Sequence, residues 1–142
     1  MSEELQIIRE FFSADTYAMD LTGITIDEVG DRSAVCSLCP QAKHANADGV
    51  VQGGAIYTLA DFCFAVAANG RSIAQRGLPE KVTYTANITY LRPAKLGQKL
   101  IAAAKCIKDG RTACCYEVSI SAQDDRETIL ATAVISGISV HR

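Results

Sequence analysis

Residues 53–70, GGAIYTLADFCFAVAANG, decide the fold of this chain. We expect a helix from about Gly54 to Asn69, with Gly70 as its C-terminal cap. Apolar or small side chains surround its one charged residue, Asp61, so the helix has no polar face and is expected to be buried on all sides. Because an isolated ionised carboxylate is costly in low dielectric, Asp61 is a candidate catalytic group.

The segments on either side of this helix predict a single α+β domain over residues 1–142, with a largely antiparallel sheet. A short amphipathic helix is expected at 3–13 and a polar functional loop at 41–52. Strands are expected at 23–29, 33–39, 82–91, 99–107, 112–121 and 128–140. A sheet curled around the helix would bury most of it. Since one six-stranded sheet cannot cover it completely, we expect a partner subunit to cover the rest.

Composition argues against several kinds of partner. The net charge is −2 over 142 residues, and no stretch is densely basic, so nucleic acid is not an expected partner. The longest apolar run, 55–68, is shorter than a membrane span and is interrupted by Asp61, so no membrane association is expected. The chain opens on acidic residues without a secretory signal, and its six cysteines are expected to remain reduced in the cytoplasm.

The cysteine and histidine pattern does not predict a metal site. Cys36 and Cys39 have a spacing that zinc and redox motifs use. In a strand, however, residues three apart point to opposite faces, and no second pair follows at metal-ligand spacing. We therefore expect no bound metal. His44 lies in the polar loop near Asn46 and is expected to be exposed, although it could line a pocket there.

Three segments of the chain resemble one enzyme family. They are Asn46-x-x-Gly49 with Gly53-Gly54, Leu59-Ala60-Asp61 within the helix, and Asn87-Ile88-Thr89-Tyr90-Leu91-Arg92-Pro93-Ala94-Lys95-Leu96-Gly97. Together they resemble the hotdog-fold acyl-CoA thioesterases of the phenylacetic-acid-degradation (PaaI-type) branch, over roughly residues 20–140. The resemblance implies a six-stranded antiparallel sheet wrapped around one long central helix. It also implies a homodimer that forms the active site, with dimers pairing into a homotetramer.

The resemblance also implies roles for the helix. Free N–H groups at Gly53 and Gly54 would stabilise the oxyanion of a thioester carbonyl, although paired glycines could merely permit tight helix entry. Asp61 lies eight residues later, about 12 Å along a helix that rises ~1.5 Å per residue, so the two features should meet across two subunits. Asp61 would act as general base or as nucleophile. Otherwise it is a buried carboxylate capped by a neighbouring hydroxyl such as Thr58.

Three further positions correspond to catalytic positions of the family. Thr83 falls where relatives place a hydroxyl that orients water, although threonine is also a common strand former. Asn46 corresponds to an asparagine that contacts the thioester or the water, although Asn is common in turns. Gln52 stands where relatives generally carry His. Glutamine keeps a hydrogen-bond donor but exchanges no protons near neutral pH, which puts the acid side of the mechanism in doubt.

The expected substrate is an acyl- or aroyl-CoA, with coenzyme A as part of the substrate and no separate cofactor. Gly54 and Tyr57 are candidate contacts for the acyl group and thioester, and Arg92 and Lys95 for the phosphates of coenzyme A. The main alternative is a non-catalytic acyl-CoA-binding or regulatory hotdog protein. A hotdog dehydratase is a third possibility, but such enzymes pair a histidine with the acid, and this helix has none.

Overall fold

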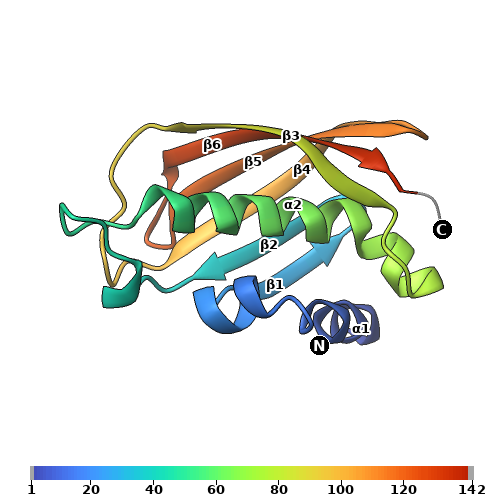
Figure 1. The fold of residues 1–142 in the computed structure, drawn as a ribbon, viewed down its shortest axis with the longest axis horizontal. Helices are drawn as coiled ribbons and strands as arrows, with labels where there is room; N and C mark the ends of the chain where they lie inside the picture. The colour runs from blue at the N-terminus through green and yellow to red at the C-terminus, as the bar shows by residue number, and fades with distance from the viewer. Residues whose placement is uncertain (1, 141–142) are drawn as a thin grey trace.

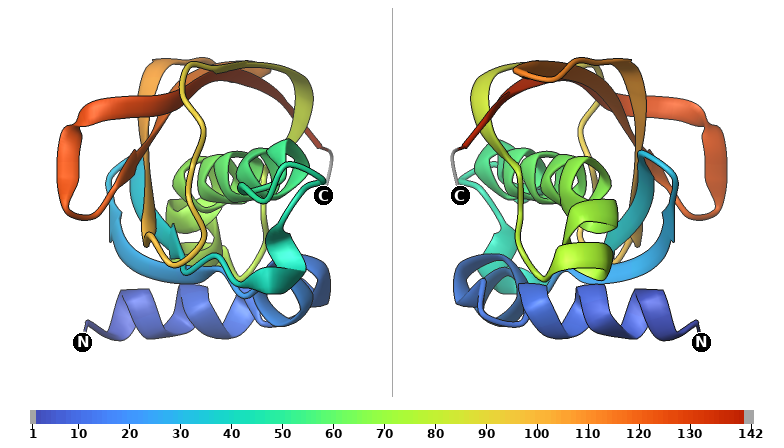
Figure 2. Two further views of the ribbon diagram at one scale, coloured as in Figure 1. Left: turned by 90° about the vertical axis from the view of Figure 1, so that its left-hand side faces the viewer. Right: turned by 90° about the vertical axis from the view of Figure 1, so that its right-hand side faces the viewer.

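The computed structural model describes residues 2–140, in which one long helix lies along the concave face of one antiparallel sheet (Figure 1). The helix is α2 (Gly53–Arg76). The strands are β1 (Thr25–Gly30), β2 (Ser33–Leu38), β3 (Lys81–Tyr90), β4 (Leu100–Asp109), β5 (Ala113–Ala122) and β6 (Asp125–Ser139). They are ordered β1-β2-β4-β5-β6-β3. Seen end-on in Figure 2, the sheet curls around α2, which confirms the predicted hotdog arrangement.

Alternating residues of the strands build the core between sheet and helix. In β5, Tyr116, Val118 and Ile120 are fully buried, whereas the residues between them are only partly covered. This period of two is the pattern of a sheet with one face on the core. The ring of Tyr116 meets Phe64 of α2 edge-on, with centroids 5.4 Å apart. The central strands therefore hold the middle of α2 in place.

The C-terminal end of α2 differs from the prediction. The helix continues to Arg76, and Gly77 caps it in the left-handed conformation (φ 72°), donating its N–H to Ile73 O. Gly70 is an interior residue of the helix. A Cβ there would lie 3.1 Å from Val29 Cγ1 and 3.4 Å from Ile8 Cδ1. Glycine at this position reflects close packing against β1 and the N-terminal helix, so the predicted cap at Gly70 is wrong.

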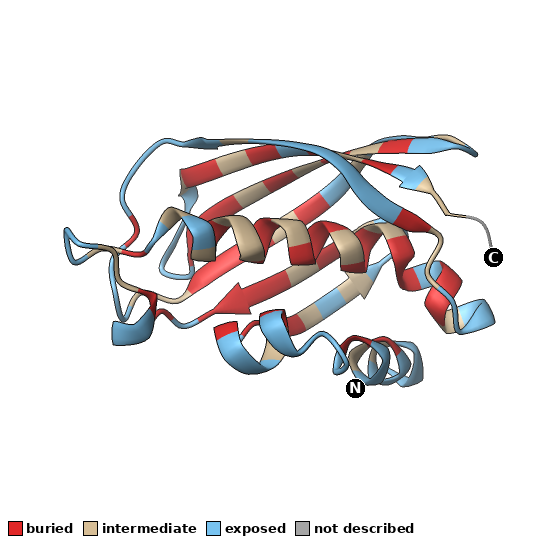
Figure 3. Cartoon of the chain, viewed as in Figure 1, coloured by how far each residue is buried: buried red, intermediate tan, exposed pale blue. Residues whose placement is uncertain are grey.

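As expected, the sheet does not cover α2 completely in the single chain. One stripe along the helix, coloured tan in Figure 3, is only partly covered. Its members share one side of the helix and are Tyr57, Thr58, Asp61, Ala65 and Ala68. We call them the open stripe. Asp61 lies on it, so the only carboxylate of α2 occupies the stripe that remains partly accessible in the single chain.

The N-terminal segment packs against the side of α2 that the sheet leaves uncovered (Figure 2). Helix α1 (Glu3–Phe12) begins at the predicted place, and Ser2 caps it by accepting from Leu5 N. Phe12 packs edge-on against Phe62 of α2, with centroids 5.3 Å apart. A π-helical turn, η1 (Thr16–Thr22), and a short 3₁₀ turn, η2 (Ala42–His44), were not predicted. No helix within residues 2–140 is long and apolar enough to cross a membrane.

Candidate active site

Asp61 forms a side-chain pair with β3. The Thr83 hydroxyl donates to Asp61 Oδ1 at 2.7 Å. Thr83 faces α2 because it lies opposite Gly137 of β6, whose position packs against Phe64. A β-bulge directly after Thr83, between Thr83 and Thr85, interrupts the regular pairing with β6. Bulges of this kind re-aim side chains and occur often beside active sites.

The environment of Asp61 raises the pKa of its carboxyl group. Burial is the largest cause, because it disfavours the charged form, and the hydrogen bond from Thr83 opposes it by stabilising the carboxylate. The negative charge of Asp15 adds a smaller upward shift. Thr58 does not cap the acid: its hydroxyl donates to Gly54 O at 2.8 Å. A carboxylate with a raised pKa and one hydroxyl partner has the properties of a general base.

The first two N–H groups of α2 differ in their hydrogen bonding. Among residues 2–140, nothing accepts a hydrogen bond from Gly53 N–H, whereas Gln52 Oε1 accepts from Gly54 N at 2.5 Å. Gln52 is thus the N-cap of the helix. The two glycines, predicted as a pair of oxyanion donors, therefore differ: Gly53 N–H is available, and Gly54 N–H is occupied by the side chain that replaces the family histidine.

Tyr90 is a residue of this region that the sequence did not single out. Its hydroxyl donates to Gly53 O at 2.8 Å. Its ring lies over the glycine, where a Cβ would be 3.2 Å from Tyr90 Cζ. Glycine at position 53 therefore permits this contact, and the Tyr90 side chain fixes the first turn of α2 against β3. Tyr90 belongs to the family segment quoted from the sequence, which could have marked it as a site residue. The face of the sheet to which its side chain points, however, depends on the register of β3.

The remaining loop residues have mainly structural contacts. Asn46 Oδ1 accepts from Asp48 N at 2.9 Å and from Val50 N at 3.2 Å, so it closes the turn before α2. His44, expected to be exposed, is buried. Its Nδ1 accepts from Gln41 N at 2.9 Å and its Nε2 lies 2.7 Å from Thr22 O. This histidine holds η2 against η1 and does not contact Asp61.

The predicted site residues line separate hollows of the single chain. Asn46, Gly53 and Arg92 line one of about 290 Å³, together with Tyr90. Asp61 and Tyr57 line another of about 190 Å³, together with Asp15. Gly54 and Gln52 border a third hollow, and Lys95 lies in a fourth. Gly53 and Asp61 therefore share no hollow within one chain, in agreement with the distance expected from their spacing.

The edge of the sheet next to Asp61 is unpaired in the single chain. Strand β3 is an edge strand that pairs with β6 on one side only. Its large side chains Val82, Tyr84 and Tyr90 are exposed. An apolar strand with a free edge is a ready site for pairing with another strand.

Within the described part of the chain, no three His, Cys, Asp or Glu side chains come together as a metal site. Cys36 is buried within β2, whereas Cys39 is exposed and lies just beyond the strand, which ends at Leu38 and not at the predicted residue 39.

Comparisons with known proteins identify the family of this chain. Residues 48–129 match the family model described as the thioesterase superfamily. Human acyl-coenzyme A thioesterase 13 is 33% identical over 116 residues, which cover 79% of this chain and 80% of that protein.

Solved structures show the same fold. The PaaI protein of the Escherichia coli phenylacetic acid degradation operon has a TM-score of 0.81 at 23% identity, covering 98% of this chain and 97% of that one. A hypothetical thioesterase from Streptococcus pneumoniae, solved with coenzyme A, has a TM-score of 0.78 at 22% identity, covering 92% and 98%. With the sequence match to the family model, these findings show that the chain belongs to the thioesterase superfamily, as its PaaI-type motifs indicated.

Proposed function

We propose that this protein hydrolyses an acyl- or aroyl-CoA thioester to the free acid and coenzyme A, using Asp61 of one subunit and Gly53 of another. Membership of the thioesterase superfamily and a relative named as an acyl-coenzyme A thioesterase support the reaction class. The observation that carries the site is the pairing of Asp61, on the open stripe, with Thr83 of β3, together with a Gly53 N–H that has no acceptor within residues 2–140. No separate cofactor is required.

The reaction follows from these groups. Asp61 removes a proton from a water held beside the Thr83 hydroxyl, and the water oxygen attacks the thioester carbonyl carbon. The carbonyl oxygen becomes negative and is stabilised by Gly53 N–H and by the positive end of the α2 dipole. The tetrahedral intermediate then collapses, its carbon–sulfur bond breaks, and the thiolate of coenzyme A leaves.

Gln52 in place of a histidine is compatible with this route. A thiol has a pKa of about 8.5, so its thiolate leaves near neutral pH without protonation by a general acid. The proton on Asp61 passes to the departing thiolate or to solvent. Gln52 also occupies Gly54 N–H, so the proposed oxyanion hole depends on Gly53, and Gly54 borders the thioester without donating to it.

The two halves of the site require a second copy of the chain. Gly53 and Asp61 line different hollows of one chain, so neither hollow alone holds both the oxyanion donor and the base. Strand β3 carries Thr83 and has a free edge with exposed apolar side chains. Pairing of two β3 edges would join two sheets and cover the open stripes. We infer a homodimer on this basis, and a homotetramer from the family resemblance.

The hollow beside Gly53 suits the coenzyme A portion of the substrate. It is bordered by Asn46 and Arg92, and the Arg92 guanidinium donates to Ile129 O through Nη1, which leaves further N–H groups for a phosphate. The exposed Lys95 is a second candidate phosphate contact. The S. pneumoniae neighbour solved with coenzyme A supports this class of ligand. Tyr57, beside Asp61, is a candidate contact for the acyl group.

The test is release of free thiol from benzoyl-, phenylacetyl- and medium-chain acyl-CoA by the wild type and by Asp61→Asn. Asn has nearly the shape of Asp but is not a base, so we expect kcat to fall about 10²–10⁴-fold, the usual contribution of a positioned general base. Equal thiol release by both proteins would contradict the proposal. Binding of acyl-CoA without thiol release by either protein would instead favour the non-catalytic acyl-CoA-binding alternative.

Base and nucleophile roles of Asp61 are separated by a single turnover in H₂¹⁸O. A general base delivers ¹⁸O to the acid product alone. A nucleophile first forms a mixed anhydride, whose hydrolysis at the Asp61 carbonyl leaves ¹⁸O in the protein. Mass analysis of the Asp61-containing peptide distinguishes the two outcomes.

A further inference from the structure

Asn69 is a buried polar residue whose side chain is fully hydrogen-bonded. Its Nδ2 donates to Ala65 O and to Lys81 O, both at 3.0 Å. Its Oδ1 accepts from Glu80 N at 2.8 Å and from Lys81 N at 2.7 Å. Only 3% of the residue is exposed. Placing an amide in the core is unfavourable unless every polar atom is paired, and here every one is.

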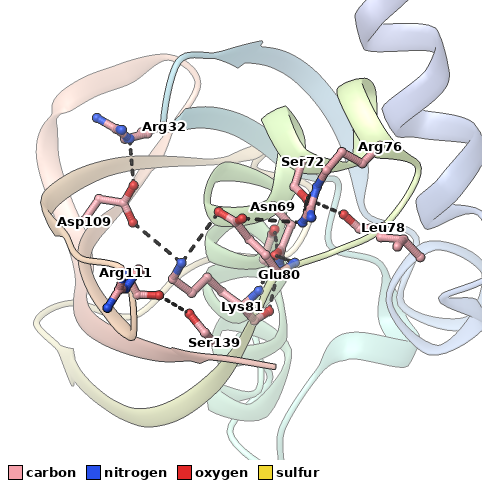
Figure 4. A network of polar contacts seen from close by, with 11 residues as sticks. Arg32, Asn69, Ser72, Arg76, Leu78, Glu80, Lys81, Asp109, Arg111 and Ser139 are labelled. Carbon is pink, nitrogen blue, oxygen red and sulfur yellow. Dashed lines mark hydrogen bonds and ion pairs between the residues drawn. The ribbon is translucent and has the colours of Figure 1, made fainter. Parts of the chain in front are cut away.

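These bonds attach the helix to the first residue of β3, as the close-up in Figure 4 shows. Lys81 is held on both its N–H and its C=O by the one side chain. It begins the strand two residues before Thr83. On the helix, Asn69 follows Asp61 by eight residues, about two turns at 3.6 residues per turn. In addition to the Tyr90 contact at the start of α2, the helix and strand β3 are therefore joined by side chains at two points near Thr83, Asn69 to Lys81 and Asp61 to Thr83.

The attachment matters because the sheet alone holds this part of β3 weakly. Strand β3 is an edge strand with one neighbour, β6, and the bulge after Thr83 breaks the regular pairing at that residue. On the N-terminal side of Thr83, the hydrogen bonds of Asn69 fix the position of Lys81, the first residue of the strand. The Lys81 ammonium adds to them, since it lies 3.9 Å from Asp109 Oδ1, which belongs to β4.

We propose that Asn69 is a positioning residue for the thioesterase reaction: by holding Lys81 on both sides, it sets the strand so that the Thr83 hydroxyl reaches Asp61. The inference rests on the proposed function, because it concerns the orientation of the proposed base. Asn69 itself touches no substrate. Its effect on catalysis passes through Thr83, which predicts that the two residues are energetically coupled.

Ser72 provides a matched control one turn further along α2. It is also buried, and its hydroxyl donates to Leu78 O at 2.6 Å. It therefore ties the helix to the loop before β3 and makes no bond with the strand. Ser72→Ala likewise removes the side-chain hydrogen bonds of a buried residue, the one donated to Leu78 O and those accepted from Arg76. A purely structural role for Asn69 therefore predicts similar behaviour of Ser72→Ala and Asn69→Ala.

The experiment compares Asn69→Ala, Thr83→Val, the double variant and Ser72→Ala by thiol release from acyl-CoA across pH. We expect Asn69→Ala to lower kcat about tenfold through lost orientation, with little change in KM. The acid limb of its pH profile should shift upward, as in Thr83→Val, because the Thr83 hydrogen bond lowers the pKa of Asp61. In the Thr83→Val background, Asn69→Ala should add little, since the contact it supports is already gone. Ser72→Ala should keep the wild-type pH profile.

The results separate the two proposals. If Asp61→Asn keeps wild-type turnover, the proposed function fails and this inference fails with it. Two outcomes would overturn the positioning role alone, provided that Asp61→Asn is inactive. In the first, Asn69→Ala has the same pH profile and kcat as Ser72→Ala. In the second, the fold-loss of kcat in the Asn69→Ala, Thr83→Val double variant equals the product of the losses in the two single variants. Should Asn69→Ala fail to fold, Asn69→Asp is the second variant, since it keeps the acceptor oxygen for Glu80 N and Lys81 N but loses the donor to Lys81 O. We expect this variant to show the same coupling with Thr83→Val, with a smaller loss of kcat.

Discussion

The two sides of α2 are built from different chemistry. The side toward the central strands carries Leu59, Cys63 and Phe64, all fully buried. The open stripe carries small residues, two hydroxyls and one carboxylate, and it remains accessible in the single chain. Apolar burial stabilises the folded state, whereas partial burial of the ionised Asp61 carboxylate destabilises it, as its raised pKa indicates. Stability and the proposed reactivity therefore belong to different sides of one helix, so substitutions on one side should change unfolding and those on the other should change thiol release.

The largest effect on stability is expected at Phe64. Phe64→Ala would leave a cavity against Tyr116 and Gly137, and such truncations lower the free energy of unfolding by about 3–5 kcal/mol. Denaturant unfolding followed by circular dichroism measures the change. The folded fraction should retain its pH profile of thiol release. A changed profile would show that the packed side also sets the chemistry, and the comparison of the two sides would then break down.

A smaller effect is expected at the start of the helix. Gln52→Ala removes the side chain that accepts from Gly54 N, and loss of an N-cap lowers the free energy of unfolding by about 1 kcal/mol. It also frees a second N–H beside Gly53. We expect kcat to be maintained or raised while the midpoint of denaturation falls. Gln52→Asn, which retains a capping oxygen, is the control. A collapse of kcat in the Ala variant alone would show that Gln52 itself takes part in the reaction.

The smallest effect is a pH-dependent gain in stability from Asp61→Asn. The folded-state pKa of Asp61 is raised, mainly by burial, so the folded protein binds more protons than the unfolded chain. Stability of the wild type therefore falls as pH rises from the unfolded value of about 3.9 through the folded pKa. Above that pKa the Asn variant should gain relative to the wild type, and the gain should fade toward low pH. If the difference in free energy of unfolding between the two proteins did not change with pH, burial would not raise the pKa of Asp61.

Much of the fold could be predicted because its signals are local. The apolar run around Asp61 and the Asp109-Gly110 turn indicate a central helix and a hairpin from neighbouring residues alone. The end of α2 could not be predicted in this way. Gly70 and Gly77 look alike in sequence, and only the packing of Gly70 against Val29 and Ile8 shows which one lies inside the helix.

The sequence indicates which residues belong to the candidate site, but not which of them are in contact. Asp61 and Thr83 were identified singly, and their hydrogen bond depends on the register of β3. The role of Tyr90 depends on the same register. Asn69 was expected only as the end of the helix, because nothing local indicates that its amide binds a strand that begins twelve residues later. Long-range pairing of this kind is set by tertiary structure, which a single sequence does not display.

The bulge in β3 has a consequence for the length of that strand. Thr83 and Tyr90 are seven positions apart, so in a regular strand their side chains would point to opposite faces. Both nevertheless reach α2, because Tyr84 is an extra residue that reverses the alternation between them. Deleting Tyr84 would turn Thr83 away from Asp61 while every named site residue remained in the chain. The number of residues in β3 therefore matters to the site as well as their identity. In a relative that lacks one residue between the positions of Thr83 and Tyr90, the contact between Thr83 and Asp61 would be lost.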